Sequence, residues 1–173
     1  RYTPQIQIVH EDKLLGTAGT LCNNLNFFDN GTSLLIHADN LMLDKLENLI
    51  EAHLARPTHC LLTMLTFETT DPSSCGIVCN DNDGVIQHFH EKSNLENGYI
   101  ANGAVYCFGS DFLKYISEMQ PAPVDFSLDV IPAIIGRMYT YHTPMPFVDI
   151  GSPERLQAAH QIFENHSCLT SYE

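Results

Sequence analysis

The chain has 173 residues, the size of one ordinary domain, and hydrophobic residues make up 44% of it, which is enough to bury a core. Its 21 acidic and 8 basic residues give a formal net charge of -13, and no Lys/Arg cluster is present. Such a surface repels nucleic acid and anionic membranes, so we expect neither as a partner. The charged fraction of 17% argues against a disordered or coiled-coil chain.

The sequence carries no sign of a membrane or an export route. No apolar run approaches the ~20 residues that span a bilayer, and no basic-then-apolar leader opens the chain. We therefore expect a cytoplasmic protein. The cysteines are scattered, several of them in apolar runs, which is typical of thiols in a reducing compartment. Cys75 and Cys79 lie near His88 and His90, but without a paired short Cys spacing they do not favour a zinc site.

The first half of the chain alternates predicted strands and helices. Apolar residues at helical spacing predict an early helix that Thr17 caps. Gly16 precedes that helix and would leave backbone N–H groups open to a ligand that approaches closely. The predicted elements are a strand at 5–9, a helix at 17–28, a strand at 33–38, a helix at 43–54 and a strand at 59–67.

The second half adds antiparallel pairing to this alternation. Ser152, Pro153 and Glu154 form a strong helix opening, with a capping serine, a proline in the first turn and a favourable acid. The order predicts a three-layer Rossmann-like α/β fold with a mixed sheet, as one domain over residues 1–173. The predicted elements are a hairpin of 77–79 with 85–89, a strand at 99–108 interrupted near 102, helices beginning near 111 and at Asp125 or Ser127, a strand at 138–142 and a helix from 152.

Two aspartates follow apolar segments and are candidate metal ligands. Asp39 ends the run 33–38, and Asp149 follows Phe147 and Val148. Two carboxylates at neighbouring strand ends can hold one Mg²⁺ and leave room for phosphate oxygens. Each residue could equally be an ordinary loop or cap aspartate, because the spacing alone does not separate the two interpretations.

Glu91 and Lys92 end the predicted strand at 85–89. A lysine at a strand end can act as a point charge on a phosphate, and the same pair could be a surface ion pair at a turn. His88 and His90 share one face of that strand, where polar strand-face residues are a better interpretation than catalytic or metal-binding ones.

Six short segments then occur in one known order. They are 10–21 with Leu-Gly-Thr-Ala-Gly, 36–40 ending in Ala-Asp-Asn, 74–78 with Cys-Gly-Ile-Val, 89–92 with Phe-His-Glu-Lys, 100–106 with Asn-Gly-Ala-Val-Tyr, and 126–129 followed by 147–154 with Asp-Ile-Gly-Ser-Pro-Glu. Together they resemble the motifs of sugar-1-phosphate nucleotidyltransferases over nearly the whole chain. The Gly-Thr-Ala-Gly form is most similar to that of mannose-1-phosphate or manno-heptose-1-phosphate guanylyltransferases.

The resemblance implies a reaction and a set of roles. A sugar-1-phosphate oxygen would attack the α-phosphorus of an NTP, here GTP, and pyrophosphate would leave. Asp39 and Asp149 match the family's Mg²⁺ ligands, and Lys92 matches the lysine on the sugar phosphate. The remaining matches lie in the sugar pocket and on the nucleotide side: Glu91, Gly76 and Asn102, and Gly16 with Thr17.

The chain departs from the family pattern at its start. The glycine-rich loop that cradles the triphosphate, which the family places upstream of residue 5, does not occur in these 173 residues. We therefore expect an N-terminally incomplete domain whose first strands are missing, with this chain alone inactive, and a partner copy over the exposed sheet edge. Milder departures are Ser93 for proline, Phe147 for tryptophan and Ser152 for threonine.

Two other functions fit parts of the pattern. The missing loop is compatible with a non-catalytic subunit that binds a nucleotide sugar or regulates an enzyme. A glycosyltransferase of the related α/β type would also use an acidic motif at a strand end, but Asp39-Asn40 lacks the second acid of the usual Asp-x-Asp.

Overall fold

The computed structural model describes residues 6–28, 31–92 and 98–170, and side chains of the last helix as far as Glu164. The strands are β1 (Ser33–Ile36), β2 (Asn40–Met42), β3 (Leu62–Glu68), β4 (Gly76–Asn80), β5 (Ile86–Glu91), β6 (Ile100–Phe108), β7 (Met138–His142) and β8 (Phe147–Asp149). The helices are α1 (Thr17–Asn23), α2 (Leu46–Ala55), α3 (Ser110–Glu118), α4 (Ile131–Ala133) and α5 (Pro153–Thr170). Short turns are η1 (Leu25–Phe27), η2 (Pro72–Ser74) and the π-helical η3 (Phe126–Val130).

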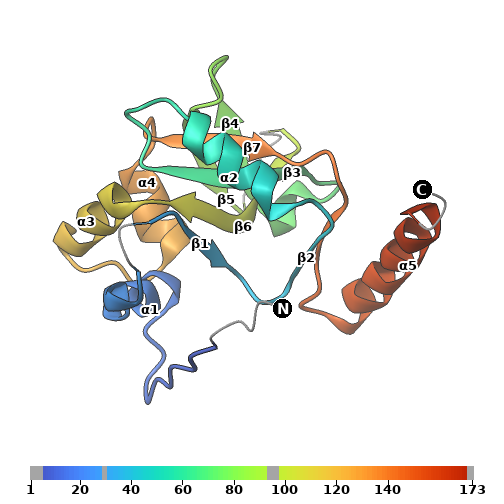
Figure 1. The fold of residues 1–173 in the computed structure, drawn as a ribbon, viewed down its shortest axis with the longest axis horizontal. Helices are drawn as coiled ribbons and strands as arrows, with labels where there is room; N and C mark the ends of the chain where they lie inside the picture. Colours follow the sequence, from blue (N-terminus) through green and yellow to red (C-terminus); the bar gives the residue numbers. More distant parts are fainter. Residues whose placement is uncertain (1–5, 29–30, 93–97, 171–173) are drawn as a thin grey trace.

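The main sheet is mixed, as the sequence predicts. Its strands run in the order β5-β4-β6-β3-β7, and β1 also pairs with β6. The β3–β7 pair is parallel, whereas the pairs of β6 with β1, β3 and β4 are antiparallel. A second sheet of β2 and β8 lies to one side of it (Figure 1).

Helices cover both faces of the sheet, which gives the predicted three layers. On one face α2 buries Leu49 against Leu65, Val105 and Cys107. On the other face α1, α3, η3 and α4 surround the alternate side chains of the same strands. Residues there that are almost fully buried are Leu62, Met64, Tyr106, Phe108, Phe112, Phe126 and Ile131. Each such side chain contributes roughly 1.5–3 kcal/mol by leaving water, so the alternation along β3 and β6 holds the layers together.

One edge of β6 is shared between two strands, and this splits the sheet. Strand β1 pairs with residues Val105 to Phe108, while β4 meets the same edge at Ala101. No described strand pairs with residues 102–104 on this side. The register of β3 against β6 also shifts between Met64 and Thr66, and Ala104 has a positive φ of 50°. Ligands of α/β proteins bind where neighbouring strands part in this way.

Most predicted elements form, with three corrections. Residues 6–9 of the predicted strand 5–9 form no strand and are exposed, with Ile8 89% exposed, because no described strand lies beside them; Gln5 lies outside the described residues. Thr17 is the first helical residue, and the N-cap is Gly16, which makes no side-chain cap hydrogen bond. The strand predicted at 33–38 ends at Ile36, and the two short strands β2 and β8 are not predicted from the sequence at all.

Two predicted helix openings and the predicted strand over β6 are confirmed. Asp125 caps η3 through a hydrogen bond from the Leu128 N–H, and Ser152 Oγ accepts one from the Arg155 N–H at the start of α5. The strand over β6 is continuous despite its irregularity at 102–104. Cys22, Cys60 and Cys107 are thiols, with no disulfide. Among the described residues no helix combines the length and apolar composition needed to cross a membrane.

A buried histidine makes stability depend on pH. His53 of α2 is 2% exposed, and its Nδ1 lies 3.0 Å from Thr63 Oγ1 of β3. Burial, and secondarily the Arg56 charge, lower the pKa of His53 from 6.5 to about 4. The unfolded chain therefore binds this proton between pH 6.5 and about 4, whereas the folded chain does not.

We expect the free energy of unfolding to fall across that window, by up to about 1.4 kcal/mol per pH unit from this residue. Urea unfolding of the wild type and His53→Gln, at pH 7 and in steps to 4.5, measures the effect. The difference between the two proteins should shrink on acidification, while exposed His59→Gln should follow the wild type. A constant difference would contradict the assignment.

Candidate functional site

Residues 102–104 form the centre of the candidate site, where β1 and β4 part. The His37 N–H donates to the Ala104 carbonyl at 3.3 Å, which brings the end of β1 to this point. Asn40 Nδ2 donates to the Gly103 carbonyl at 2.8 Å, so the start of β2 lies there as well. Loop and strand-end residues therefore surround a stretch of β6 that has no strand beside it on this edge.

Asp39 and Asp149 meet at Gly151. Asn40 is paired with Asp149 in the β2–β8 ribbon, and the Ile150 N–H donates to the Asp39 carbonyl at 2.7 Å. A Cβ atom placed on Gly151 would lie 2.9 Å from Asp149 Oδ1 and 3.5 Å from Asp39 Oδ2. The two carboxylates thus border one point, as the sequence predicts for neighbouring strand ends.

This pair of oxygen donors fits a Mg²⁺ ion. Mg²⁺ commonly takes one or two carboxylates and completes its coordination with water and phosphate oxygens. Within the described ranges no group of three or more His, Cys, Asp or Glu could hold a metal ion. That finding also leaves the thiol–histidine group of Cys75, Cys79, His88 and His90 without support as a zinc site.

Arg155 is a site residue that the sequence analysis misses. Its Nη1 donates to Asp149 Oδ2 at 2.8 Å, while the Gly151 N–H donates to Asp149 Oδ1 at 2.7 Å. The ion pair joins the first turn of α5 to the end of β8, and no local pattern in the sequence indicates it.

Gly76 and Glu91 face each other across the β4–β5 hairpin. A Cβ on Gly76 would lie 2.8 Å from Glu91 Oε2 and 2.5 Å from Phe89 Cζ, so no larger residue fits without displacement. Burial raises the pKa of Glu91; the Lys92 charge opposes this rise and the Asp125 charge adds to it. Lys92 is exposed with a φ of 42°, and its N–H donates to the Cys75 carbonyl at 3.2 Å.

Asn102 is held in place by two hydrogen bonds. Its Nδ2 donates to the Tyr106 hydroxyl at 2.8 Å, and its Oδ1 accepts from the Ala104 N–H at 2.9 Å. Tyr106 is 1% exposed, and burial raises its pKa well above the usual range. An amide can make four hydrogen bonds, so the Asn102 side chain keeps one N–H and one lone pair for a ligand.

Gly16 and Thr17 organise a loop rather than an open helix end. The Val124 carbonyl accepts from the Ala18 and Gly19 N–H groups at 3.0 and 3.2 Å, so these groups are not open as predicted. Thr17 Oγ1 accepts from the Phe126 N–H at 2.8 Å. These contacts fix residues 124–126, and Asp125 within them raises the pKa of Glu91 and of Tyr106 as a minor contribution after burial.

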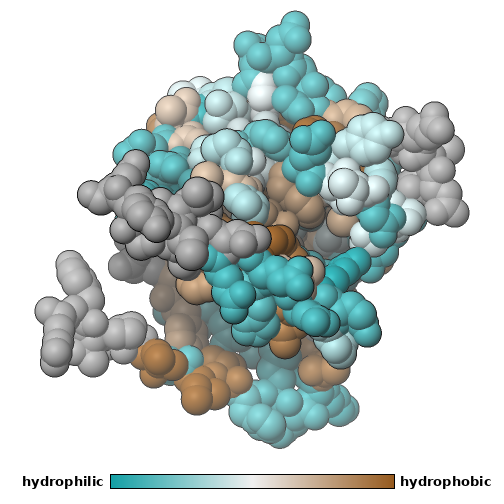
Figure 2. Space-filling view, turned by 90° about the vertical axis from the view of Figure 1, so that its right-hand side faces the viewer, coloured by the Kyte–Doolittle hydropathy of each residue, from teal (hydrophilic) through white to brown (hydrophobic). Residues whose placement is uncertain are grey.

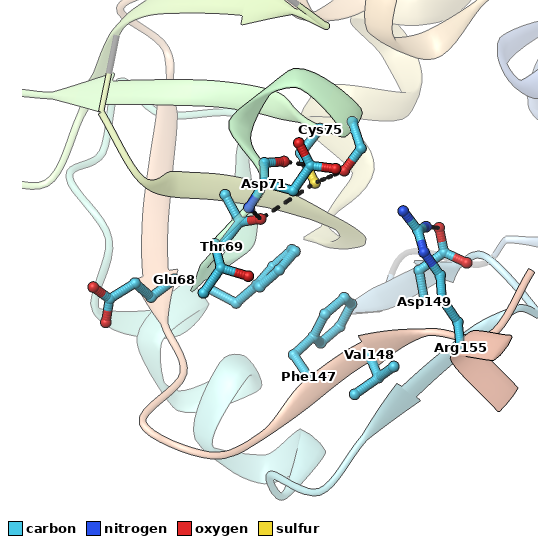
Figure 3. Close-up of a pocket in the computed structure, with 11 residues that line it drawn as sticks. Glu68, Thr69, Asp71, Cys75, Phe147, Val148, Asp149 and Arg155 are labelled. Atoms are coloured by element: carbon cyan, nitrogen blue, oxygen red, sulfur yellow. Dashed lines mark hydrogen bonds and ion pairs between the residues drawn. The ribbon is translucent and has the colours of Figure 1, made fainter. Parts of the chain in front are cut away.

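A pocket of about 380 Å³ lies between the end of β3 and β8 (Figure 3). Phe67 and Phe147 stack with ring centroids 4.5 Å apart and form its apolar part. Seen from the α5 side, the surface is mostly hydrophilic, with hydrophobic atoms in its central hollow (Figure 2). The residues that line the pocket are Phe67, Glu68, Thr69, Thr70, Asp71, Ser74, Cys75, Phe147, Val148, Asp149 and Arg155.

The structure is an α/β protein with a split mixed sheet, in which two carboxylates border one point. Comparison with known proteins is more specific: the nucleotidyl transferase family matches residues 1–166, and the chain belongs to that family. This confirms the family resemblance that the sequence motifs predict.

Individual relatives are distant. Glucose-1-phosphate adenylyltransferase of Thermotoga maritima is 28% identical over 155 residues, which cover 83% of this chain and 37% of the relative. Mannose-1-phosphate guanylyltransferase of Mycobacterium tuberculosis is 26% identical over 154 residues, covering 87% and 42%. The chain thus spans less than half the length of these curated relatives.

Solved structures share the fold. HddC from Yersinia pseudotuberculosis, also solved in complex with GMP-PN, has a TM-score of 0.72 and 25% identity over 88% of this chain and 64% of its own. A glucose-1-phosphate thymidylyltransferase from Bacillus anthracis, described as putative in its own structure report, has a TM-score of 0.74 and 21% identity, with coverage of 88% and 62%. The three-layer α/β fold is therefore confirmed as the nucleotidyltransferase fold.

Gly16 should not tolerate a side chain. Its φ of 80° and ψ of 168° are essentially restricted to glycine, and an added Cβ would lie 2.4 Å from the Val124 carbonyl oxygen. We expect Gly16→Ala to lower the free energy of unfolding by at least about 2 kcal/mol.

Gly136→Ala is the matched control, because Gly136 has a φ of 78° with no atom within 4 Å of its added Cβ. Denaturant unfolding should show a loss of only about 1 kcal/mol there. Equal losses in the two variants would exclude the clash with Val124 as the cause.

Proposed function

We propose that the whole protein transfers a nucleoside monophosphate from an NTP to a sugar 1-phosphate and releases pyrophosphate. The observation that carries this proposal is the meeting of the Asp39 and Asp149 carboxylates at Gly151, beside the stretch of β6 that holds Asn102. Family membership over residues 1–166 supports the same reaction class. In this reaction both reacting phosphates arrive ionised, so positioning and charge stabilisation supply most of the rate.

Each residue then has a role that its position supports. Asp39 and Asp149 would hold Mg²⁺, which would supply positive charge to the phosphate oxygens. Lys92, exposed at the end of β5, would pair with the sugar phosphate. Glu91 and Asn102 would bind sugar hydroxyls, and Gly76 would let the ring approach the backbone. The Gly16–Thr17 turn would support the nucleotide side by fixing the loop at 124–126.

We propose GTP as the nucleotide. Glu11 Oε2 accepts from the Leu15 N–H at 3.3 Å, while the buried Oε1 has no hydrogen-bond partner among the described residues. A carboxylate only accepts hydrogen bonds, and guanine presents the adjacent N1–H and N2–H₂ donors. A guanine edge that displaced the groups now covering this oxygen would supply the hydrogen bond it lacks. The relatives named above transfer nucleotides with different bases. The GMP-PN complex of HddC supports a guanine nucleotide.

We propose mannose or manno-heptose 1-phosphate as the sugar substrate. The Gly-Thr-Ala-Gly sequence from Gly16 supports it, since this form is most similar to that of enzymes making GDP-activated manno sugars. The Mycobacterium tuberculosis relative carries a matching name. A cytoplasmic location and a homo-oligomeric state stay predictions.

Pyrophosphate release by the full-length protein tests the reaction. With GTP, mannose 1-phosphate and Mg²⁺ we expect turnover, and Asp39→Asn and Asp149→Asn should each lower kcat by on the order of 100-fold or more. Asp83→Asn, an exposed acid in the β4–β5 turn, is the matched control and should leave kcat unchanged. No release with any NTP and sugar 1-phosphate would exclude the reaction, and a fully active Asp39→Asn would exclude the metal assignment.

Competition between nucleotides tests the base. Glu11→Gln replaces one acceptor oxygen by a donor, so we expect kcat/KM for GTP to fall roughly 10- to 100-fold while that for ATP changes little. Exposed Asp12→Asn serves as the matched control for the charge change. Equal losses with GTP and ATP would show that Glu11 supports the fold of this segment rather than reading the base.

A further inference from the structure

Among the described residues that line the pocket between β3 and β8, Arg155 is the one cation. The same lining includes the acids Glu68, Asp71 and Asp149. The Arg155 guanidinium pairs with Asp149, and 46% of each of the two side chains is exposed. Both are in the pocket wall opposite Asp71 and Cys75 (Figure 3). An anionic ligand entering here meets three carboxylates, so Arg155 is the lining residue whose charge attracts it.

The field of Arg155 reaches across the pocket. Hydrogen bonds from Ser73 and Ser74 are the main cause of the lowered pKa of Asp71, and the Arg155 charge lowers it further. Arg155 also lies in the first turn of α5, where the helix dipole disfavours a cation. An anionic partner compensates for that position, and in this structure the partner is Asp149.

Asp149 is engaged on both oxygens. Oδ1 accepts from the Gly151 N–H, and Oδ2 accepts from Arg155. A cation bound between Asp149 and Asp39 would therefore compete with Arg155 for the same carboxylate. Positive charge added beside Asp149 weakens the attraction that holds Arg155 there. The guanidinium is then available to a planar or tetrahedral oxyanion, which it binds through two parallel hydrogen bonds.

We propose that Arg155 binds the phosphate of the sugar 1-phosphate once a cation occupies the site between Asp39 and Asp149. Until then, Arg155 stays paired with Asp149 and does not bind the phosphate. This inference rests on the proposed function. It adds a second cation to Lys92 and links anion binding to the state of Asp149. A purely structural Arg155 would only tie the start of α5 to β8, and would not couple the two events.

A double-mutant cycle without metal tests the exchange. Calorimetry in EDTA measures mannose 1-phosphate binding to the wild type, Asp149→Asn, Arg155→Gln and the double variant, with circular dichroism confirming that each is folded. We expect Asp149→Asn to bind roughly 5-fold more tightly than the wild type because Arg155 is released, and this gain to vanish in the Arg155→Gln background. Glu68→Gln, an exposed acid that also lines the pocket, should give the same change in both backgrounds.

Cation binding gives a second measurement. In Mn²⁺ titrations followed by electron paramagnetic resonance, Arg155→Gln should bind the ion several-fold more tightly, because a competitor for Asp149 is gone. Arg155→Lys should lie between the two, and Arg137→Gln, whose arginine packs on Tyr115 away from the pocket, should match the wild type.

The outcomes separate this inference from the proposed function. An Asp149→Asn gain that persists in the Arg155→Gln background, or an unchanged Mn²⁺ affinity in Arg155→Gln, overturns the exchange even if the enzyme is active. A wild type that neither binds a sugar 1-phosphate nor releases pyrophosphate overturns the proposed function. The Mn²⁺ comparison then still decides whether Arg155 competes for Asp149.

Discussion

On one edge of β6, the backbone of residues 102–104 must find hydrogen-bond partners outside the sheet, and the rest of the structure depends on how it does so. Two strands share one edge of β6, so the backbone between them lacks a strand partner, and buried peptide groups need hydrogen bonds from elsewhere. The Asn40 side chain, the His37 N–H and the Asn102 side chain supply them. These hydrogen bonds hold the residue after β1 and the start of β2 beside this stretch of β6. Polar side chains gather there because the backbone requires them.

Charge is the second constraint on this molecule. Under the proposed function, a chain with a net charge of -13 must bring positive charge to a phosphate from few basic residues. The charge of Asp149 is partly neutralised within the site, because its two oxygens accept hydrogen bonds from the Gly151 N–H and from Arg155. Asp149 is thus positioned by specific hydrogen bonds, and Arg155 offsets its negative charge locally.

The sequence predicted the parts of the fold in which local pattern and long-range packing agree. Helix α2, the β4–β5 hairpin and strands β3, β6 and β7 follow from periodicity and turn residues. The alternation at 5–9 predicted a strand wrongly. An alternating pattern shows which side chains would share a face, but a strand also needs a neighbouring strand to pair with, and the pattern does not show whether one is present. Strands β2 and β8 have three residues each, too few for any periodicity, and they exist through pairing with each other.

The site was predictable to a similar degree. The positions of Asp39 and Asp149 after apolar segments indicated neighbouring strand ends, and both carboxylates lie near Gly151; their role as metal ligands stays a prediction. Arg155 was missed because its significance comes from an ion pair with Asp149 across a turn, which composition and spacing do not reveal. Gly16 was identified for its missing side chain, but its neighbour is the Val124 carbonyl and not an open space.

The two asparagines whose side chains bond to the backbone of β6 limit which substitutions this protein can tolerate. Asn40 and Asn102 each form a hydrogen bond with a peptide group of β6 and also lie at the candidate site. Selection for folding and selection for substrate therefore act on the same two side chains. Under the proposed function, a change of substrate would arise more readily at Glu68, Thr70 or Cys75, which line the pocket without supporting that stretch of strand.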